Sequence, residues 1–446
     1  MPSEKHPKAK SVESLRHAEY YDMQRTFDEL YTRSQAREVF DNLMELILSK
    51  DNIMLAYRNI KSNSGSATPG TDRLRITDIG RLPADEVVAR VRKIVRGGTN
   101  GYTPRSVRRK EIPKPNGKTR PLGIPCIWDR LIQQCIKQVM EPICEAKFCN
   151  NSYGFRPNRS VEHAINRTYT MLQMMNLHYV IEFDIKGFFM SIDCECLLKY
   201  LLPFIKEKWN YWKGTIYEQD LDLVLWLTEV IVRHRPQDDC IRQGNLKLWR
   251  ILPKNKSLFY IEWMRGEPIG NLTSQLFANF YMSFFDEWAI KAAEERGAKY
   301  VRFVDDFSFV CKTKEDAIYF KRASRNQLRY ILNIQMHPNK IYIQEVKKGI
   351  KMVGGVIKPG RAYLSNRTVG NFINAVSYLE EACKNCDKEA IYANVRSINS
   401  YLGFLIHYQS YGIRRKAFSE LHYFWKACYI QGKFQVVKIK NTVQCL

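Results

Sequence analysis

The sequence predicts an α+β fold, because strand-like and helix-like patterns alternate along the chain and helical patterns dominate toward its end. Two short extended segments flank an Asn-Gly turn within residues 107–124, and apolar runs cover residues 179–185 and 300–310. Runs of this length are typical of strands, and Asn-Gly between extended segments is a strong hairpin signal. A chain of 446 residues with 45% hydrophobic content can form two or three packed modules.

The first 60 residues predict a basic, helical N-terminal extension. Apolar residues recur there at helical spacing among charged ones, from residue 12 to about residue 58. A stretch rich in Gly, Pro and Ser (62–72) then opens a region that we place at 61–178, with helices expected over 82–95 and 129–147 on either side of the hairpin.

The region 179–360 contains the two apolar strand runs and predicts a sheet. Residues 201–265 are rich in Trp, Tyr and Lys and interrupt the pattern, which indicates an insertion. From residue 361 to residue 446 the sequence is mostly helical, including residues 421–429, and this change predicts a separate C-terminal module.

The charge of the chain favours a polyanionic partner. Seventy Lys and Arg face 46 Asp and Glu, a formal charge of +24 that is scattered over the whole length. An extended basic surface of this kind is typical of nucleic acid binding, because neutralising phosphates releases counterions. A ribosome-associated protein and a merely soluble, basic surface are the alternatives that the charge leaves open.

We expect a cytoplasmic protein with reduced thiols and no contact with a membrane. No apolar run approaches the roughly 18 residues that a membrane span needs, and the N-terminus lacks the apolar core of a signal peptide. The 12 Cys are irregularly spaced, and the pair Cys383 and Cys386 has no second pair at zinc-finger spacing.

Three aspartates predict a metal-dependent phosphoryl-transfer site. Asp305 and Asp306 are adjacent within an apolar, aromatic stretch, and Asp184 ends the other apolar run. The pair alone is more often an exposed turn. Three carboxylates at neighbouring strand ends, however, are what two divalent ions need to activate a hydroxyl and stabilise departing pyrophosphate.

Five ordered motifs resemble those of reverse transcriptases. Residues 300–306 (YVRFVDD) resemble the paired-aspartate motif, with Phe303 where Tyr is commoner, and residues 183–189 (FDIKGFF) resemble the first palm motif. The segments 120–125 (RPLGIP), 129–130 (DR) and 152–160 (SYGFRPNRS) resemble the fingers blocks of group II intron and related bacterial enzymes.

This resemblance, which covers roughly residues 62–360, implies a right-hand polymerase and an RNA-directed DNA polymerase activity. Fingers are then expected at 61–178, a palm with an antiparallel sheet at 179–360 and a helical thumb at 361–446. It also implies two Mg²⁺ ions bound by Asp184, Asp305 and Asp306, with an oxygen from the Ile185 carbonyl. The partners would be an RNA template, deoxynucleoside triphosphates and the DNA product.

The resemblance assigns nucleotide contacts to five further residues. Phe189 matches the side chain that packs under the sugar and excludes a 2′-hydroxyl, and Gly270 would let the backbone approach the templating pair. Two cations of the hairpin, Lys114 and Arg120, would hold the incoming triphosphate, and Lys340 would assist the departure of pyrophosphate. Each of these cations also fits an ordinary solvated charge.

One motif departs from the commoner pattern and bears on the biological setting. Residues 266–275 read GEPIGNLTSQ, with Ile269 where many reverse transcriptases have Gln. Together with residues 400–404 (SYLGF) and the later Arg414 and Arg415, this variant resembles diversity-generating retroelement and defence-associated enzymes. No cluster resembling an HNH nuclease follows, which predicts a stand-alone polymerase.

We therefore expect anti-phage defence with a bound, structured non-coding RNA as template. A diversity-generating retroelement enzyme and a group II intron-derived enzyme are the alternatives within the family. An RNA-binding splicing cofactor that has lost polymerase activity is the alternative of another class. An intact set of three aspartates disfavours that cofactor, because RNA binding alone gives no chemical reason to keep them.

Overall fold

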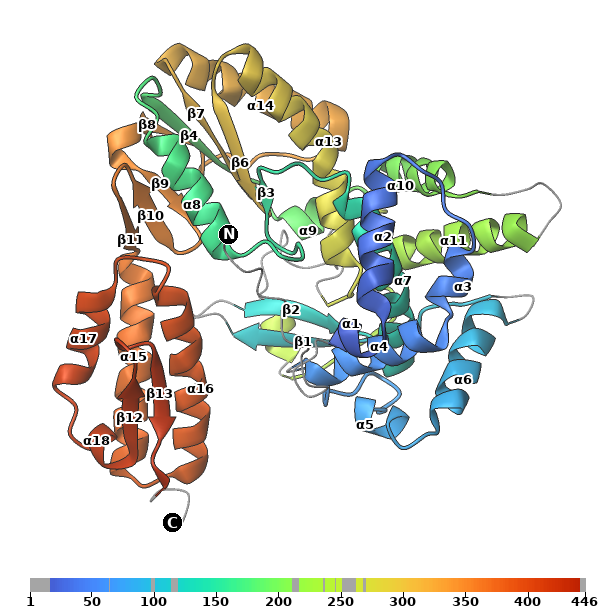
Figure 1. The fold of residues 1–446 in the computed structure, drawn as a ribbon, viewed down its shortest axis with the longest axis horizontal. Coiled ribbons are helices and arrows are strands. Elements are labelled where there is room, and N and C mark those ends of the chain that lie inside the picture. Colours follow the sequence, from blue (N-terminus) through green and yellow to red (C-terminus); the bar gives the residue numbers. More distant parts are fainter. Residues whose placement is uncertain are drawn as a thin grey trace, which may run out of the picture. The chain divides into compact units, whose positions relative to one another are not determined.

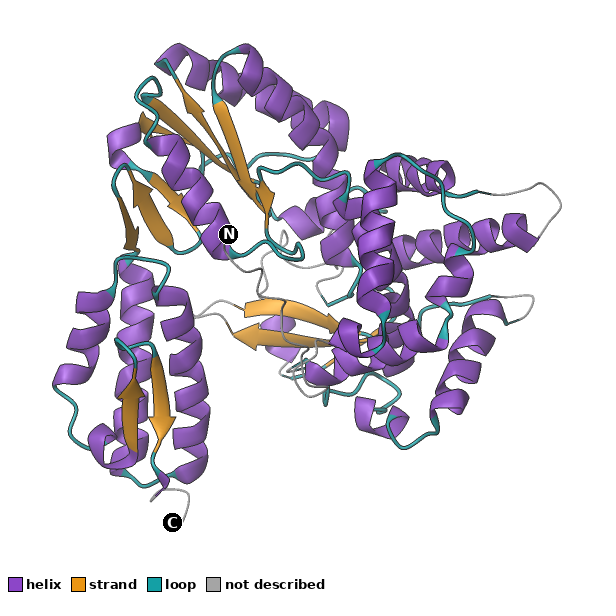
Figure 2. Cartoon of the chain, in the orientation of Figure 1, coloured by secondary structure: helices purple, strands orange, loops and turns teal. Residues whose placement is uncertain are grey.

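The computed structural model describes residues 17–63, 65–97, 101–113, 119–210, 216–235, 237–244, 246–250, 262–267 and 270–441. Helices and sheets occur together along the chain, which confirms the predicted α+β class (Figures 1 and 2). The chain divides into two units, each assembled from separate stretches. The first comprises Met1–Cys149, Lys186–Glu287 and Asn326–Gln335, and the second comprises Asn150–Ile185, Trp288–Arg325 and Met336–Leu446.

The first unit is mainly helical and is organised around α7 (Ile127–Glu145), which is buried along most of its length. Helices from the predicted N-terminal extension and from the segment after it pack on α7: α2 (Met23–Gln35), α3 (Leu43–Ile47), α4 (Lys50–Ser62) and α6 (Ala84–Arg96). The unit also contains α1 (His17–Tyr20), α5 (Ile76–Ile79), α9 (Phe188–Ser191), α10 (Cys194–Lys208), α11 (Ile216–Arg233) and α12 (Leu246–Arg250). Helix α13 (Ser274–Glu295) begins in this unit.

A small sheet with the order β2-β1-β5 completes the first unit. The predicted hairpin is confirmed, since β1 (Val107–Pro113) pairs antiparallel with β2 (Thr119–Ile124). Its Asn-Gly turn lies outside the described residues. Strand β5 (Cys240–Arg242), from the predicted insertion, pairs in parallel with β1 and thereby extends the hairpin.

The second unit is built on a five-stranded sheet with the order β3-β6-β7-β4-β8 (Figure 1). The strands are β3 (Ser152–Tyr153), β6 (Lys299–Phe303), β7 (Asp306–Cys311), β4 (Tyr179–Asp184) and β8 (Tyr342–Glu345). All neighbouring pairs are antiparallel except β3 with β6, which is parallel. Both apolar runs that predicted strands therefore lie side by side at the centre of this sheet.

The two faces of the sheet differ in chemistry. On one face, Phe183, Phe307, Phe309 and Tyr300 form an aromatic layer, and Phe320 of α14 (Lys314–Leu332) stacks on Phe309 with ring centroids 4.1 Å apart. The other face is covered at one end by α8 (Val161–Leu172), which buries three valines in one apolar cluster: Val180, Val301 and Val310. The opposite end of that same face carries polar side chains.

Local sequence signals account for where many helices begin. Helices α4, α8 and α10 follow Ser49, Ser160 and Asp193, whose side chains accept hydrogen bonds from backbone N–H groups of the first turn. A capping side chain of this kind satisfies a donor that the helix itself leaves unpaired. The predicted helices over 82–95 and 129–147 are confirmed as α6 and α7, with boundaries shifted by at most two residues.

The C-terminal part of the second unit is mostly helical, as predicted, and has its own core. Helices α15 (Asn366–Lys384) and α16 (Lys388–Leu405) pack against each other. Two further helices, α17 (Tyr411–Ser419) and α18 (Phe424–Ala427), pack on α15. A three-stranded sheet precedes them: β9 (Ile350–Met352), β10 (Gly355–Lys358) and β11 (Arg361–Leu364), in the order β11-β10-β9.

The helical prediction over 421–429 is confirmed only for residues 424–427, which form α18, and is wrong at both ends. The chain leaves α18 after Ala427 and forms the antiparallel hairpin β12 (Cys428–Gln431) and β13 (Val436–Ile439), which packs on α16. A short apolar run fits a helix or a strand equally well, and pairing with β13 decides between them here. Within the described ranges, no helix combines the length and the apolar character that a membrane span requires.

Candidate active site

Strand alternation brings the candidate catalytic residues of the second unit to one end of one sheet face. Asp184 ends β4, and its register partner across the β4–β7 pair is Asp306, the first residue of β7. Register partners share a face and lie side by side. Glu182 and Ser308 form the next pair on that face, because side chains alternate with a period of two.

The third aspartate, Asp305, lies in the tight turn between β6 and β7, which contains Val304 and Asp305. Val304 has a φ of 57°, a left-handed conformation that a β-branched residue rarely adopts. Two hydrogen bonds maintain this conformation: Val304 N donates to Tyr153 O at 3.1 Å, and Arg302 Nη1 donates to Val304 O at 2.9 Å. Strain of this kind persists only where the surroundings enforce it.

Arg302 supports the turn from inside the unit. Its side chain is buried, and its Nη2 donates to Ser152 Oγ at 2.8 Å. Gly154 also packs closely on the turn, since a Cβ at this position would lie 2.5 Å from Cγ2 of Val304. The segment that resembles a fingers block therefore contacts the paired-aspartate turn directly.

The carboxylates of this site disturb one another electrostatically. Although the Asp306 side chain is open to solvent, the protein surrounding it desolvates the carboxyl and raises its pKa to about 7. The negative charges of Asp305, Asp184 and Glu182 add to this rise, and Lys340 opposes it. Burial also raises the pKa of Glu182 to about 7, against the effect of a hydrogen bond from Gln344.

Lys340 partly compensates this negative charge. Its Nζ lies 2.5 Å from Oδ2 of Asp184, and the backbone of Asp184 accepts a hydrogen bond from His337 N at 2.8 Å. The structure thus places Lys340 beside the aspartate that sequence analysis paired with it in the same reaction. The Lys340 ammonium group therefore lies where a metal cation bound by Asp184 could also lie.

Asp184, Asp306 and Lys340 line a cavity of about 320 Å³. The lining combines the acidic end of the sheet with residues of β8, β9 and β10 and with Ser365. It includes side chains that sequence analysis missed: Glu182, Ser308, Tyr342 and Lys351. Glu182 was detectable, since it precedes Asp184 by two residues in a strand and must share its face. Tyr342 and Lys351 gave no such signal, because their position depends on tertiary pairing.

The donor set fits divalent metal ions of the hard class. Aspartate carboxylates are hard oxygen ligands, and the excess of negative charge around Asp306 favours a bound cation. Among the described residues, no three or more His, Cys, Asp or Glu are already gathered as a metal site. Asp184, Asp305 and Asp306 are the residues that would hold such ions, with the Ile185 carbonyl as a further oxygen.

The remaining predicted site residues belong to the first unit. Lys114 lies outside the described residues, and only the backbone of Arg120, in β2, is described. Phe189 is half-buried in the one-turn helix α9 and packs on Phe188 with ring centroids 5.4 Å apart. Gly270 has a φ of 129°, and a Cβ at this position would overlap the carbonyl oxygen of Gly123. The packing on β2 is therefore sufficient to require glycine there.

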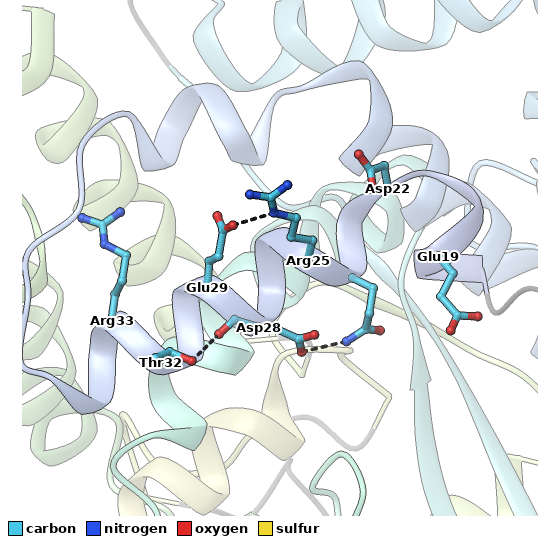
Figure 3. A pocket seen from close by; sticks show the side chains of 8 residues that line it. Glu19, Asp22, Arg25, Asp28, Glu29, Thr32 and Arg33 are labelled. Atoms are coloured by element: carbon cyan, nitrogen blue, oxygen red, sulfur yellow. Dashed lines mark hydrogen bonds and ion pairs between the residues drawn. The ribbon is translucent and has the colours of Figure 1, made fainter. Parts of the chain in front are cut away.

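A second group of acidic residues lies on the surface of the first unit and contrasts with the aspartate site. Figure 3 shows this shallow pocket along α2, where most of the labelled side chains are exposed. Arg25 pairs with Glu29 at 2.9 Å, and Gln24 donates to Asp28 at 2.9 Å. Carboxylates paired at i,i+4 on a solvated helix face need no further partner.

The chain matches the family model of reverse transcriptase (RNA-dependent DNA polymerase) over residues 112–357, more than half of its length. It is 27% identical over 347 residues to protein YkfC of Escherichia coli, covering 70% of this chain and 81% of YkfC. It is also 27% identical over 366 residues to the group II intron-encoded protein LtrA of Lactococcus lactis. That match covers 73% of this chain and 58% of LtrA.

Solved structures give a weaker match. The apo telomerase of Candida tropicalis aligns with a TM-score of 0.43 and 14% identity, covering 72% of this chain and 59% of the telomerase chain. The family match alone supports the assignment. It includes both aspartate motifs, and it confirms the right-hand polymerase class, the divalent-metal requirement and the RNA-directed DNA polymerase activity expected from the motifs. This chain belongs to the reverse transcriptase family.

Proposed function

We propose that this protein copies a bound RNA into DNA at the acidic end of the β4–β7 pair. The main support for this proposal is the register of that pair, which places Asp184 opposite Asp306, with Asp305 in the adjoining turn. In our proposal these aspartates bind two Mg²⁺ ions. When bound, the ions would neutralise the phosphate charge and activate the primer hydroxyl.

The residues around the aspartates would orient and stabilise the reacting groups. Lys340, now paired with Asp184, is positioned to offset the negative charge of the departing pyrophosphate. Phe189 would pack against the sugar and reject a 2′-hydroxyl, and Gly270 would pass close to the templating base pair. Lys114 and Arg120 would hold the triphosphate from the hairpin.

We further propose a cytoplasmic enzyme whose template is a structured non-coding RNA, acting in anti-phage defence. The segment 266–275 and the charge of +24 support this setting. The similarity to LtrA supports the alternative of a group II intron-derived enzyme, and a diversity-generating retroelement is the third setting. The three settings differ in the RNA that the protein would carry.

The test is incorporation of labelled deoxynucleotides, with Mg²⁺, on the RNA that co-purifies with the protein. The wild type and an Asp305→Ala, Asp306→Ala double variant are compared, with and without RNase pretreatment. We expect DNA synthesis by the wild type alone, lost after RNase, and the sequence of the product identifies the template. If neither protein makes DNA on this RNA or on a primed generic template, the RNA-binding cofactor replaces the polymerase as the better account.

A further inference from the structure

The segment Met264 to Glu267 runs antiparallel to the start of α10 and the short helix α9. Cys194 N donates to Met264 O at 2.9 Å, and Gly266 N donates to Ile192 O at 2.8 Å. The last contact of this pairing is made by Glu267, whose N–H donates to Phe189 O at 2.7 Å. A helix of one turn leaves its carbonyl groups without intrahelical partners, so Glu267 supplies a partner that α9 lacks.

The side chain of Glu267 is fully buried, and among the described residues no basic side chain pairs with it, which is unusual for a buried carboxyl group. Its Oε2 accepts a hydrogen bond from Oγ of Ser274, the first residue of α13, at 2.8 Å. Oε1 has no hydrogen-bond partner within the part of the chain that the structure describes. Burial raises the pKa of Glu267 to about 7. An apolar residue would fill this position at lower cost, so packing alone does not explain the glutamate.

Gly270 and Leu272, a few residues after Glu267, each contact another element of the first unit. Gly270 packs directly on the Gly123 carbonyl of β2, as described above. Leu272 N donates to Oε1 of Gln133, a buried side chain of α7, at 3.1 Å. Glu267 therefore contacts the start of α13 through its carboxyl and the carbonyl of Phe189 through its backbone N–H.

We propose that Glu267 is a positioning residue for Phe189, and that it thereby sets the discrimination between deoxynucleotides and ribonucleotides. This inference rests on the proposed function, in which Phe189 packs against the sugar. The Phe189 ring is half-buried on a helix of only four residues. Its position therefore depends on contacts from outside α9. Displacement of such a group by about 1 Å alters reactivity by up to a hundredfold.

The experiment measures kcat/KM for single-nucleotide addition to a primed RNA template, with a deoxynucleotide and with the matching ribonucleotide. The ratio of the two values is compared among the full-length wild type, Glu267→Ala, Glu267→Gln, Ser274→Ala and Phe189→Ala. Gln138→Ala is the matched control, because Gln138 is a buried polar residue of α7 that donates to Asn52 Oδ1 at 2.7 Å. Loss of this hydrogen bond destabilises the first unit without changing any residue between Met264 and Ser274.

We expect Glu267→Ala and Ser274→Ala to lower the ratio by about tenfold, less than the loss caused by Phe189→Ala. Glu267→Gln keeps an acceptor for Ser274 and should restore the ratio to near the wild-type value. The double variant of Glu267→Ala and Phe189→Ala should match Phe189→Ala alone, since both changes act through one ring.

A wild-type ratio in Glu267→Ala, with both substrates slowed equally as in Gln138→Ala, would overturn the positioning role and leave the polymerase intact. A wild-type ratio in Phe189→Ala would overturn it as well, by removing the gate on which Glu267 acts. Absence of all DNA synthesis by the wild type would instead overturn the proposed function together with this inference.

Discussion

Two groups of acidic side chains in this molecule have similar composition and different environments. On α2, Asp28 and Glu29 accept hydrogen bonds from Gln24 and Arg25 one helical turn away, in full contact with solvent. At the end of the β4–β7 pair, strand register forces Asp184 and Asp306 side by side. Helix geometry places a hydrogen-bond donor one turn away from each of these carboxylates, whereas sheet geometry places like charges together.

A cluster of charged side chains indicates function where the fold holds like charges side by side. On α2, Glu29 is paired with Arg25 and Asp28 accepts a hydrogen bond from an uncharged amide, and both carboxylates are exposed, so they form a solvated surface. At the aspartate site Lys340 forms an ion pair with Asp184, and the pKa of Asp306 is raised by desolvation and by its acidic neighbours. The fold maintains this unfavourable arrangement on a strained turn, and a bound divalent cation would relieve it.

The largest expected effect is the loss of DNA synthesis in the Asp305→Ala, Asp306→Ala double variant. Metal ligands supply several kcal/mol of charge stabilisation to the transition state, which corresponds to about a thousandfold in rate. The measurement is single-turnover incorporation on a primed RNA template. Retention of more than a tenth of the wild-type rate would mean that Asp305 and Asp306 do not bind the metal ions of the reaction.

Replacement of Arg302 tests whether the strained turn is part of the site. Arg302→Ala removes the hydrogen bonds to Val304 O and Ser152 Oγ and should lower the free energy of unfolding by about 3 kcal/mol. DNA synthesis by the folded variant should fall by roughly ten- to a hundredfold, because Asp305 is no longer held in place. Arg302→Lys keeps the charge and should lie between. Denaturant unfolding and incorporation assays separate the two effects, and a stability loss with an unchanged rate would contradict the role of the turn.

Glu267 is a buried carboxyl group whose pKa is raised by burial alone, against the effect of a hydrogen bond from Ser274. Its pKa is raised from 4.5 to about 7 in the folded protein, because burial disfavours the charged form. The folded state therefore holds its proton more tightly than the unfolded state. This contribution to stability is complete below pH 4.5 and is lost as the pH rises through 7.

The size of this effect should be about 3 kcal/mol between pH 4.5 and pH 8, at 1.36 kcal/mol for each pKa unit. Glu267→Gln cannot ionise, so the variant should lose less stability than the wild type over this range. Denaturant unfolding of both proteins at pH 5 and pH 8 measures the difference. Equal losses in the two proteins would show that the Glu267 carboxyl is solvated or paired in the folded state.

The sequence predicted the strands and the three aspartates, but tertiary pairing decided how they meet. Apolar patterning identified β4 and the β6–β7 pair, and the motifs identified Asp184, Asp305 and Asp306. The contact between Asp184 and Lys340 joins residues 156 positions apart and depends on β8 pairing with β4. The left-handed Val304 was equally hidden, because a β-branched residue does not favour that conformation and tertiary hydrogen bonds impose it.

The smallest expected effects are those of substitutions on α2. Asp28→Ala and Glu29→Ala each remove one exposed i,i+4 contact, so each should change the free energy of unfolding by about 0.5 kcal/mol or less. Salt should reduce the Glu29→Ala effect further, because its pair with Arg25 is solvent-exposed. DNA synthesis should stay at the wild-type rate in both variants. A tenfold fall in either variant would mean that the α2 surface takes part in the reaction. Exposed i,i+4 contacts on a helix would then not distinguish a solvated surface from a functional site.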